Sequence, residues 1–346
     1  MNNVDKQYLD LLQDILDNGV YKNTRAGWVK SVFGRTMRFN LKEGLPLLTT
    51  KKVFYKGIIH ELLWFLSGDT NIKYLVDNNV HIWDDDAYRW YLELSKKSKQ
   101  QMTKEEFLEM VKNPTSFALP TEREGILRHY KPGDLGPVYG HQWRKQGKKQ
   151  IDQIQNIINM LKTNPDDRRM LCVAWNTNDF DDMALPPCHY GFQVYTRVLS
   201  NFERLEWLWE HSDGEYDEWK TVTEKKLDEL NVPKRELSLM WMQRSCDYGL
   251  GFCFNLLSYS VLTHMIAQCV NMTCGEVICI LGDVHIYENH FDGLKEQLSR
   301  DVHKYDLPKL ILNPDITNID DFKYEDIKIE GYESFPTIKL PLSVGL

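Results

Sequence analysis

The chain lacks the features of several large classes of protein. No apolar run is long enough to cross a membrane, and charges interrupt the apolar periodicity of the opening segment MNNVDKQYLDLLQDILDNGV, which is unlike a signal peptide. The formal net charge is −8, so an overall basic surface for nucleic acid is missing too. These absences predict a cytoplasmic protein (in the host cytoplasm if the source is viral) that needs neither a membrane nor a nucleic acid as partner.

Familiar catalytic and metal-binding motifs are also missing. The seven cysteines form no C-x-x-C pair and no Cys/His pattern with zinc spacing, so no metal site is predicted. There is no serine nucleophile elbow and no glycine loop that would cradle a phosphate. Reduced thiols, most of them buried, are the simplest interpretation of an odd cysteine count. A reactive cysteine must therefore be recognised from its surroundings.

Helical and extended patterns alternate irregularly along the 346 residues, and no internal repeat occurs. Apolar periodicity predicts an N-terminal helix, a helix through Ile58 and Phe65, and long helices over 151–163 and 255–273. SVFGRTMRFNL is expected to be a pair of strands joined at Gly34. Further strands are predicted for RMLCVAWN, GFQVYTRVL, LSLMWMQRS and EVICILGDVHIY. We expect an α/β (α+β) fold, with a single large domain around one mixed β-sheet.

Two stretches have the character of insertions into that domain. Residues 91–131 hold a charged helical segment without a broad apolar face, and residues 201–236 are acidic and contain three tryptophans. Neither has the composition of a linker, so residues 1–346 are treated as one catalytic domain with two surface excursions. The second excursion, which separates two predicted strands, is a candidate contact element.

One cysteine stands out because two prolines precede it, in ALPPCHYGFQVYTR. The prolines fix two φ angles and remove two donors, so Cys188 enters its strand from a rigid approach that would suit a nucleophile. A buried structural cysteine is the competing interpretation. His189 follows directly, but neighbouring residues of a strand point to opposite faces, which argues against a Cys–His protease pair. Activation of Cys188 would need a cation from elsewhere in the chain.

Other segments supply groups that suit a nucleotide. Arg168 and Arg169 in NPDDRRM offer the forked donors that a phosphate monoester prefers. The segment QRSCDYGLGFCFN adds Gln243, Arg244, Ser245, Asp247 and Asn255 within thirteen residues. An asparagine amide matches the O4 and N3–H edge of a pyrimidine. The alternative to a nucleotide-binding role is a purely structural one, with solvated arginines and a turn capped by Asp and Asn.

Two further motifs carry titratable groups. Glu61 lies in an otherwise apolar helix, where burial would raise its pKa and suit it to proton transfer; a solvent-facing acid is the alternative. His285 and Tyr287 are two residues apart in GDVHIYENH, so both face the same side of a strand. They could hold a sugar hydroxyl or satisfy each other in the core.

Taken together, these blocks resemble the thymidylate synthase family in order and almost end to end, over residues 5–346 apart from the two insertions. The blocks are HELLWFLSGDTN, DLGPVYGHQWR, NPDDRRM, LPPCHYGFQVY, QRSCDYGLGFCFN, GDVHIYENH and the tail IEGYESFPTIKLPLSV. The resemblance implies a homodimer formed through the sheet. It also implies conversion of dUMP to dTMP with 5,10-methylenetetrahydrofolate as co-substrate and no metal.

The resemblance also implies a role for individual residues. Cys188 would attack C6 of uracil, and Arg244 would supply the cation beside the thiol. The catalytic set implied is Cys188, Glu61, Arg244, Asp247, Tyr139 and His189. The dUMP-binding set is Arg25, Arg168, Arg169, Gln243, Arg244, Ser245, Asn255, His285 and Tyr287, with Arg168 and Arg169 reaching in from the partner subunit. The folate-binding set is Ile82, Trp83, Leu185, Asp247, Gly251 and Phe254.

Three departures from the family pattern affect closure of the site or its folate side. The loop after Arg25 reads RAGWVKS instead of R-T-G-T-G-T, the tail LSVGL is two residues longer than usual, and Cys253 replaces a proline. A dUMP 5-hydroxymethyltransferase, which uses the same thiol addition but quenches the intermediate with water, is therefore the alternative activity. Asn255 argues against its cytidylate counterpart. A catalytically silent binding protein that uses residues 201–236 as its contact surface is a third hypothesis.

Overall fold

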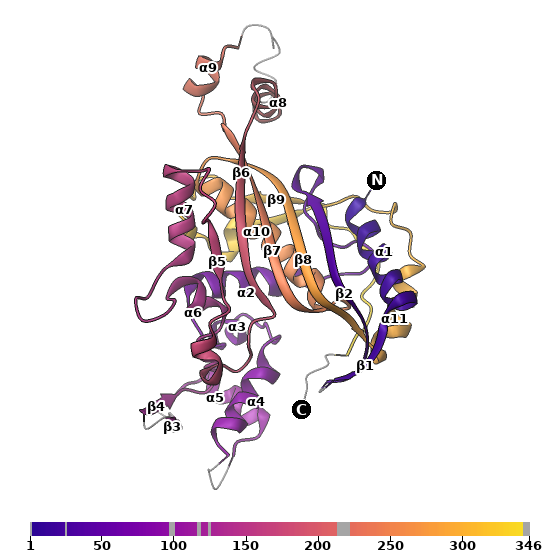
Figure 1. Ribbon diagram of the computed structural model, residues 1–346, viewed down its shortest axis with the longest axis vertical. Coiled ribbons are helices and arrows are strands. Elements are labelled where there is room, and N and C mark those ends of the chain that lie inside the picture. The colour runs from indigo at the N-terminus through magenta and orange to yellow at the C-terminus, as the bar shows by residue number, and fades with distance from the viewer. Residues whose placement is uncertain are drawn as a thin grey trace.

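The computed structural model describes residues 2–24, 26–96, 101–115, 119–123, 126–212 and 222–341. Its centre is a six-stranded sheet in the order β1-β2-β8-β7-β6-β5 (Figure 1). The strands are β1 (Val20–Thr24), β2 (Gly27–Asn40), β8 (Thr273–Tyr287), β7 (Arg235–Asp247), β6 (His189–Val198) and β5 (Leu171–Val173). Only β7 and β8 pair in parallel within this sheet, so the predicted mixed sheet is confirmed.

The predicted break at Gly34 is wrong. Residues on both sides of Gly34 belong to one continuous strand, β2, and keep a single antiparallel register with β8. Gly34 has a φ of +71°, a left-handed conformation that glycine adopts without a Cβ penalty. The glycine therefore interrupts the pairing for one residue without reversing the chain.

Helices cover one face of the sheet. The long helix α10 (Gly251–Cys269) packs on β7, β8 and α2 (Tyr55–Ser67), and α1 (Asn3–Asn18) packs on β2. Helices α6 (Tyr139–Arg144) and α7 (Gln153–Thr163) flank β5, and α11 (Phe291–Leu298) lies beside α1. Because α10 is apolar on all sides, it can only be stable as a buried helix, and it forms the middle of the core.

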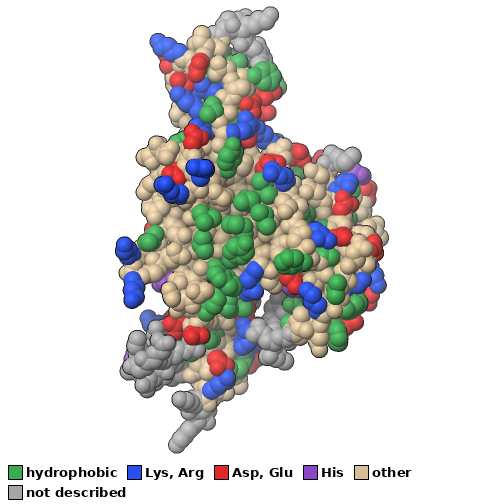
Figure 2. Space-filling view, viewed as in Figure 1, with side chains coloured by type: hydrophobic (Ala, Val, Ile, Leu, Met, Phe, Trp, Pro, Cys, Tyr) green, Lys and Arg blue, Asp and Glu red, His purple; other side chains and the backbone are tan. Residues whose placement is uncertain are grey.

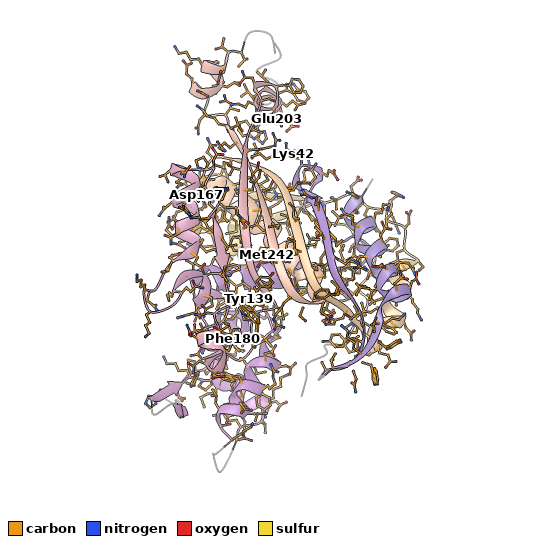
Figure 3. All side chains as sticks on the ribbon, viewed as in Figure 1. Lys42, Tyr139, Asp167, Phe180, Glu203 and Met242 are labelled. Atoms are coloured by element: carbon orange, nitrogen blue, oxygen red, sulfur yellow. The ribbon has the colours of Figure 1, made fainter. Side chains whose placement is uncertain are left out.

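The opposite face of the sheet is open. Figure 2 shows apolar side chains gathered over the strands of this face, and Met242 lies near the middle of the sheet in Figure 3. Tyr195 is 68% exposed, Leu171 42% and Ile280 40%. An exposed apolar patch of this kind usually marks an interaction surface.

The first insertion is packed more tightly than its composition suggested. It follows α3 (Lys73–Asp77) and contains the end of α4 (Asp84–Leu94), α5 (Lys104–Lys112), β3 (Leu119–Arg123) and β4 (Ile126–Tyr130). The apolar residues Phe107 and Val111 of α5 are fully buried. A narrow stripe of two residues is thus enough to fix a helix that has no broad apolar face.

The second insertion forms an arm that extends beyond the ends of β6 and β7 (Figure 1). It contains α8 (Asn201–His211) and α9 (Glu224–Glu229), which enclose a small separate cluster of Leu208, Leu227 and Val232. The buried guanidinium of Arg204 pairs with Asp228 and ties the two helices together. The arm therefore has its own small core, which holds its two helices together outside the main core.

The C-terminal part returns across the helical side. Strands β9 (Lys309–Leu312) and β10 (Ile327–Glu330) form a separate antiparallel pair. The short 3-10 helices are η1 (Leu41–Glu43), η2 (Thr177–Asp182), η3 (Glu288–His290), η4 (Ile319–Asp321) and η5 (Tyr324–Asp326). Across the described ranges, the structure contains no helix with the length and apolar character of a membrane span.

Candidate active site

Cys188 is held by backbone hydrogen bonds on both sides of its thiol. It is the last residue before β6, and its N–H donates to the hydroxyl of Tyr139 at 2.8 Å. Its carbonyl accepts from the N–H of Arg244 on β7 at 2.9 Å. All seven cysteines are free thiols, and Cys188 and Cys274 are the two that are partly exposed.

The two prolines before Cys188 hold the arginine beside it. Nε of Arg244 donates to the carbonyl of Pro187 at 2.9 Å, and Nη2 donates to the carbonyl of Pro186 at 3.0 Å. The guanidinium also lies over the ring of Trp175, 5.3 Å from its centroid. The rigid lead-in thus positions the thiol and the cation together.

The charge of Arg244 opposes a larger effect of burial on the thiol. Burial raises the pKa of Cys188, Arg244 lowers it, and the carboxylates of Asp86 and Asp247 raise it further. The net direction is upward, so in the single chain the thiol is protonated at neutral pH. In the single chain, the charge of Arg244 therefore does not outweigh the effect of burial on the thiol.

His189 cannot act as the base for Cys188. Burial lowers the pKa of His189 to about 3, so the imidazole is too weak a base to hold a proton taken from the thiol. Its Nδ1 is 2.8 Å from the hydroxyl of Tyr259, and its ring stacks on Tyr139 with centroids 4.1 Å apart. The prediction that Cys188 and His189 do not form a protease pair is consistent with this arrangement.

Glu61 on α2 is an acid poised near neutral pH. The indole N–H of Trp83 donates to Oε1 of Glu61 at 2.7 Å. Burial raises the pKa of Glu61 to about 7, although the Trp83 hydrogen bond lowers it. Of the two interpretations of the sequence, the structure supports the buried acid, and a pKa near 7 suits transfer of a proton in either direction.

Asn255 is oriented by its neighbours. Its Nδ2 donates to Oε1 of Gln243 at 3.0 Å, and the same oxygen accepts from the indole N–H of Trp241 at 3.2 Å. Nε2 of Gln243 donates to the carbonyl of Ser245 at 2.9 Å. These bonds fix the orientation of the Asn255 amide.

His285 and Tyr287 share one side of β8, as predicted. Their rings meet edge to face with centroids 5.4 Å apart. Nδ1 of His285 is 3.2 Å from Oδ1 of Asp283, which also accepts from the hydroxyl of Ser31 at 2.7 Å. Lys22 donates to the other carboxylate oxygen of Asp283 at 2.9 Å. These hydrogen bonds lower the pKa of Asp283, and the resulting carboxylate orients the imidazole.

The apolar residues predicted for the folate belong to the main core or pack against its edge. Ile82, Leu185 and Phe254 are half-buried against the core, and Trp83 is almost fully buried. Oδ1 of Asp247 accepts from the N–H groups of Gly249 and Leu250, just before α10 begins at Gly251. Apolar surface beside a carboxylate fits a heteroaromatic ring with polar edges.

The replacement of proline by Cys253 has a simple structural explanation. Cys253 is the third residue of α10, in the first turn, where backbone N–H groups have no partner inside the helix. A proline and a cysteine are both tolerated there, and Sγ of Cys253 lies 3.0 Å from the carbonyl of Leu250. This departure leaves the helix that carries Asn255 intact.

The predicted phosphate-binding residues are not assembled in the single chain. Arg168 and Arg169 are exposed, and the Arg169 side chain is 89% exposed with one distant contact, 3.9 Å, to Asp167. Asp167 lies well away from Tyr139 in Figure 3. Ser245 is half-buried on β7, while Arg25 and the tail after residue 341 lie outside the described residues.

Three residues at the site were not identified from the sequence. Trp175 stacks on Arg244, Tyr259 bonds His189, and Asp283 holds His285. Asp283 lies two residues before His285 in GDVHIYENH, and this same-face spacing could have indicated it. The partners of Tyr259 and Trp175 depend on tertiary packing, which no local pattern encodes.

Comparison with known proteins identifies the family of the chain. The family model described as "Thymidylate synthase" matches residues 6–344. The chain is also similar to a protein named "Thymidylate synthase" from Mycoplasma mobile, with 44% identity over 343 residues. That match covers 98% of this chain and 100% of the relative, so both insertions lie within the aligned length.

Proposed function

The chain belongs to the thymidylate synthase family, and we propose that it carries out that family's reaction through the thiol of Cys188. The reaction is reductive methylation of dUMP to dTMP, a one-carbon transfer. 5,10-Methylenetetrahydrofolate supplies the carbon and the hydride when it is bound. The single observation that carries the assignment of the nucleophile is the position of Cys188, partly exposed and fixed between Tyr139 and Arg244.

The chemistry begins with addition of the Cys188 sulfur to C6 of uracil. The new S–C6 bond places the electron pair of the C5–C6 double bond on C5 and O4, so C5 becomes a nucleophile. After carbon transfer the C5 proton leaves and the sulfur is later expelled, which restores the C5–C6 double bond. Arg244 stabilises the thiolate at the start and at the end of this sequence.

Glu61 is assigned to proton movement at the pyrimidine. With a pKa raised to about 7, it can protonate O4 as charge develops there and take the proton back later. Trp83 fixes the carboxyl in place. Tyr139 and the neutral His189 position the Cys188 segment rather than exchange protons with the thiol.

Asn255 is assigned to base recognition, together with the Gln243 amide that orients it. An amide that presents an acceptor and a donor pairs with O4 and N3–H of uracil, and it meets the reversed pattern in cytosine. When the hydrogen-bonding edges do not match, buried polar groups stay unpaired, and kcat/KM for the wrong substrate is strongly reduced. His285 and Tyr287, which share one side of β8, are assigned to the ribose hydroxyl because both side chains can form hydrogen bonds with a hydroxyl group.

The active enzyme is proposed to be a homodimer formed through the open face of the sheet. Supporting it are the exposed apolar residues of that face and the absence of Arg168 and Arg169 from the Cys188 site of their own chain. These arginines would bind the phosphate in the site of the partner subunit. They would also add the positive charge that Arg244 alone does not supply.

Product analysis distinguishes this function from hydroxymethyl transfer. Enzyme given dUMP and methylenetetrahydrofolate should form dTMP and dihydrofolate in equal amounts. Formation of 5-hydroxymethyl-dUMP and tetrahydrofolate would instead show that water quenches the intermediate. The family match and the 44% identical relative favour the first outcome.

A cytoplasmic location is proposed on the state of the cysteines. All seven are free, although several are buried in the same core. Unpaired thiols in this number are typical of a reducing compartment. Labelling of the unfolded protein from its native host should find seven reactive thiols.

A further inference from the structure

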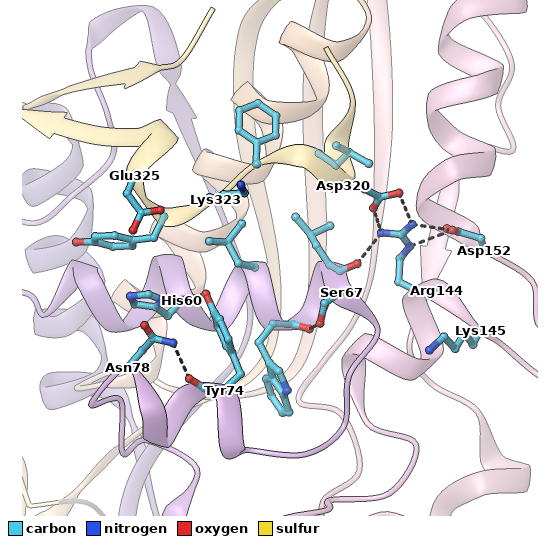
Figure 4. Close-up of a pocket in the computed structure, with 16 residues that line it drawn as sticks. His60, Ser67, Tyr74, Asn78, Arg144, Lys145, Asp152, Asp320, Lys323 and Glu325 are labelled. Atoms are coloured by element: carbon cyan, nitrogen blue, oxygen red, sulfur yellow. Dashed lines mark hydrogen bonds and ion pairs between the residues drawn. The ribbon is translucent and has the colours of Figure 1, made fainter. Parts of the chain in front are cut away.

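A second cavity lies behind the active site. It has a volume of about 640 Å³ and is enclosed by α2 on one side and by the segment from Ile319 to Glu325 on the other (Figure 4). Neither Cys188 nor any other residue proposed to bind dUMP or folate lines it. The cavity is therefore separate from the proposed reaction.

Helix α2 forms the wall between the two sites. His60, Leu63 and Trp64 line the second cavity at the three- and four-residue spacing of one helix face. Glu61 and Phe65 lie on the other side, where Glu61 bonds Trp83 and Phe65 packs 4.9 Å from the ring of Tyr139. A ligand in the cavity would thus contact the helix that carries the proton-transfer acid.

One end of the cavity is built from neutral aromatic rings. His60 and Tyr324 stack with centroids 4.4 Å apart and an interplanar angle of 6°. Tyr74 meets His60 at an edge, and its hydroxyl lies 2.9 Å from Nδ1 of His60. Burial lowers the pKa of His60 and raises those of Tyr74 and Tyr324, so all three are uncharged. This end suits a flat aromatic ring.

The rest of the cavity has an apolar middle and a rim that carries both cations and carboxylates. Ile319 and Phe322 cover the middle and are buried. At the far end Arg144 is already bonded to Asp152 and Asp320. The ammonium groups of Lys145 and Lys323, in contrast, have no carboxylate within ion-pair distance among the described residues. Glu325 also lines the cavity, on the aromatic side, where its charge acts on His60 and Tyr324. Of the two lysines, Lys323 lies nearer to His60 in Figure 4, so Lys323 is the group that can accept an anion from a ligand on the aromatic rings.

We propose that this cavity binds a small aromatic carboxylate, with its ring on the His60–Tyr324 end and its carboxylate toward Lys323. The binding site does not depend on the proposed reaction. The effect of a bound ligand on turnover does depend on the proposed reaction, because the ligand would act through Glu61. Trp64 lines the cavity and packs 5.9 Å from Trp83, the residue that holds Glu61.

Binding is measured first, by calorimetry on the full-length protein with indole-3-acetate as the probe. A ligand of this size should bind with a Kd of about 0.1 to 1 mM. 3-Methylindole, which lacks the carboxylate, should bind about tenfold more weakly. Tyr324→Leu should weaken binding of indole-3-acetate about tenfold, and Lys323→Gln should weaken it about threefold. The controls are Tyr305→Leu and Lys328→Gln, which change the same residue types outside the cavity and should leave binding unchanged.

The location is then tested with the active site filled. Protein saturated with 5-fluoro-dUMP and methylenetetrahydrofolate should still bind indole-3-acetate. Loss of probe binding in that complex, or equal binding by Tyr324→Leu and wild type, would overturn the proposed site. Neither result depends on turnover, so a failure here is distinguishable from a failure of the proposed function.

Coupling is tested by kinetics at saturating probe. Occupancy should lower kcat about fivefold and leave the KM for dUMP unchanged, because it acts on Glu61 rather than on nucleotide binding. Lys323→Gln should need more probe for the same decrease. An unchanged kcat in the presence of bound probe would contradict the coupling.

Discussion

The two sides of the proposed active site differ in how completely one chain builds them. On the thiol side, Cys188, Arg244 and Asn255 are fixed by hydrogen bonds from β6, β7 and their connecting loops. On the side proposed for the phosphate, Arg168 and Arg169 are exposed, and neither is among the charges that shift the pKa of Cys188. One side is preorganised within the fold, and the other is the side that the proposed dimer would complete.

This difference has an energetic consequence for the thiol. Burial alone raises the pKa of Cys188, and the preorganised Arg244 offsets that increase only in part. A nucleophile that needs a second subunit for its activation is inactive in an isolated chain. The division between the two sides would therefore make turnover depend on assembly.

The largest expected effect lies on the preorganised side. Cys188→Ala removes the attacking atom, so kcat should fall by about 10⁴-fold or more. Binding of dUMP, measured by calorimetry, should change by less than about threefold, because the phosphate and base contacts remain. Cys274→Ala, at the other partly exposed cysteine, serves as the control and should retain full activity.

Glu61→Gln should have the next largest effect. It keeps the shape and the Trp83 bond but removes the acid, so kcat should fall by about 10²- to 10³-fold. In the wild type, the pH dependence of kcat should show an ionisation near pH 7 that the variant lacks. A variant that kept this ionisation would show that another group moves the proton.

The same substitution predicts a change in stability with a definite sign. The folded pKa of about 7 is above the ordinary value of 4.5, so the stabilising protonated state is complete below pH 4.5 and is lost as the pH rises through 7. Between these limits the wild type should lose up to about 3 kcal/mol of unfolding free energy relative to Glu61→Gln. Urea denaturation at several pH values measures this difference.

The phosphate side is tested by mixing subunits. Arg168→Ala/Arg169→Ala should lower kcat/KM for dUMP by about 10- to 100-fold, because two charge-assisted contacts are lost. Each mixed dimer with Cys188→Ala would contain one complete site, so random assortment should restore about a quarter of wild-type activity. If no activity returned on mixing, the arginines would act within their own chain.

The smallest expected effect concerns Trp175, which supports Arg244 from behind. Trp175→Ala should lower kcat/KM about three- to tenfold, and Trp175→Phe should retain most of the activity. The substitution to alanine should also raise the pKa of Cys188, measured from the pH dependence of alkylation by iodoacetamide. An unchanged alkylation profile would show that Trp175 does not influence the thiol.

Much of the fold was predictable because its main elements have strong local patterns. The strand that follows Cys188 and the strand that carries His285 have the pattern of continuous apolar runs, and α10 has the pattern of a long buried helix. The break at Gly34 was wrong because a glycine in a strand resembles a turn when the partner strand is not known. The burial of Phe107 likewise depends on a neighbour that the local pattern does not show.

The interactions among the proposed site residues could not be predicted from the sequence. Burial of Glu61 could not be decided from its helix alone, because the pKa depends on Trp83 and the residues around it. The support of Arg244 by the carbonyls of Pro186 and Pro187 arises from the path of the loop across β7. Such contacts join segments more than fifty residues apart, beyond the reach of any sequence pattern.

The most direct test of the central claim is intact-protein mass spectrometry after incubation with 5-fluoro-dUMP and methylenetetrahydrofolate. The account predicts a stable covalent complex of protein, nucleotide and folate, with peptide mapping that places the nucleotide on Cys188 and with no complex in Cys188→Ala. A protein that turned over dUMP but formed no adduct, or that carried the nucleotide on a different side chain, would contradict it.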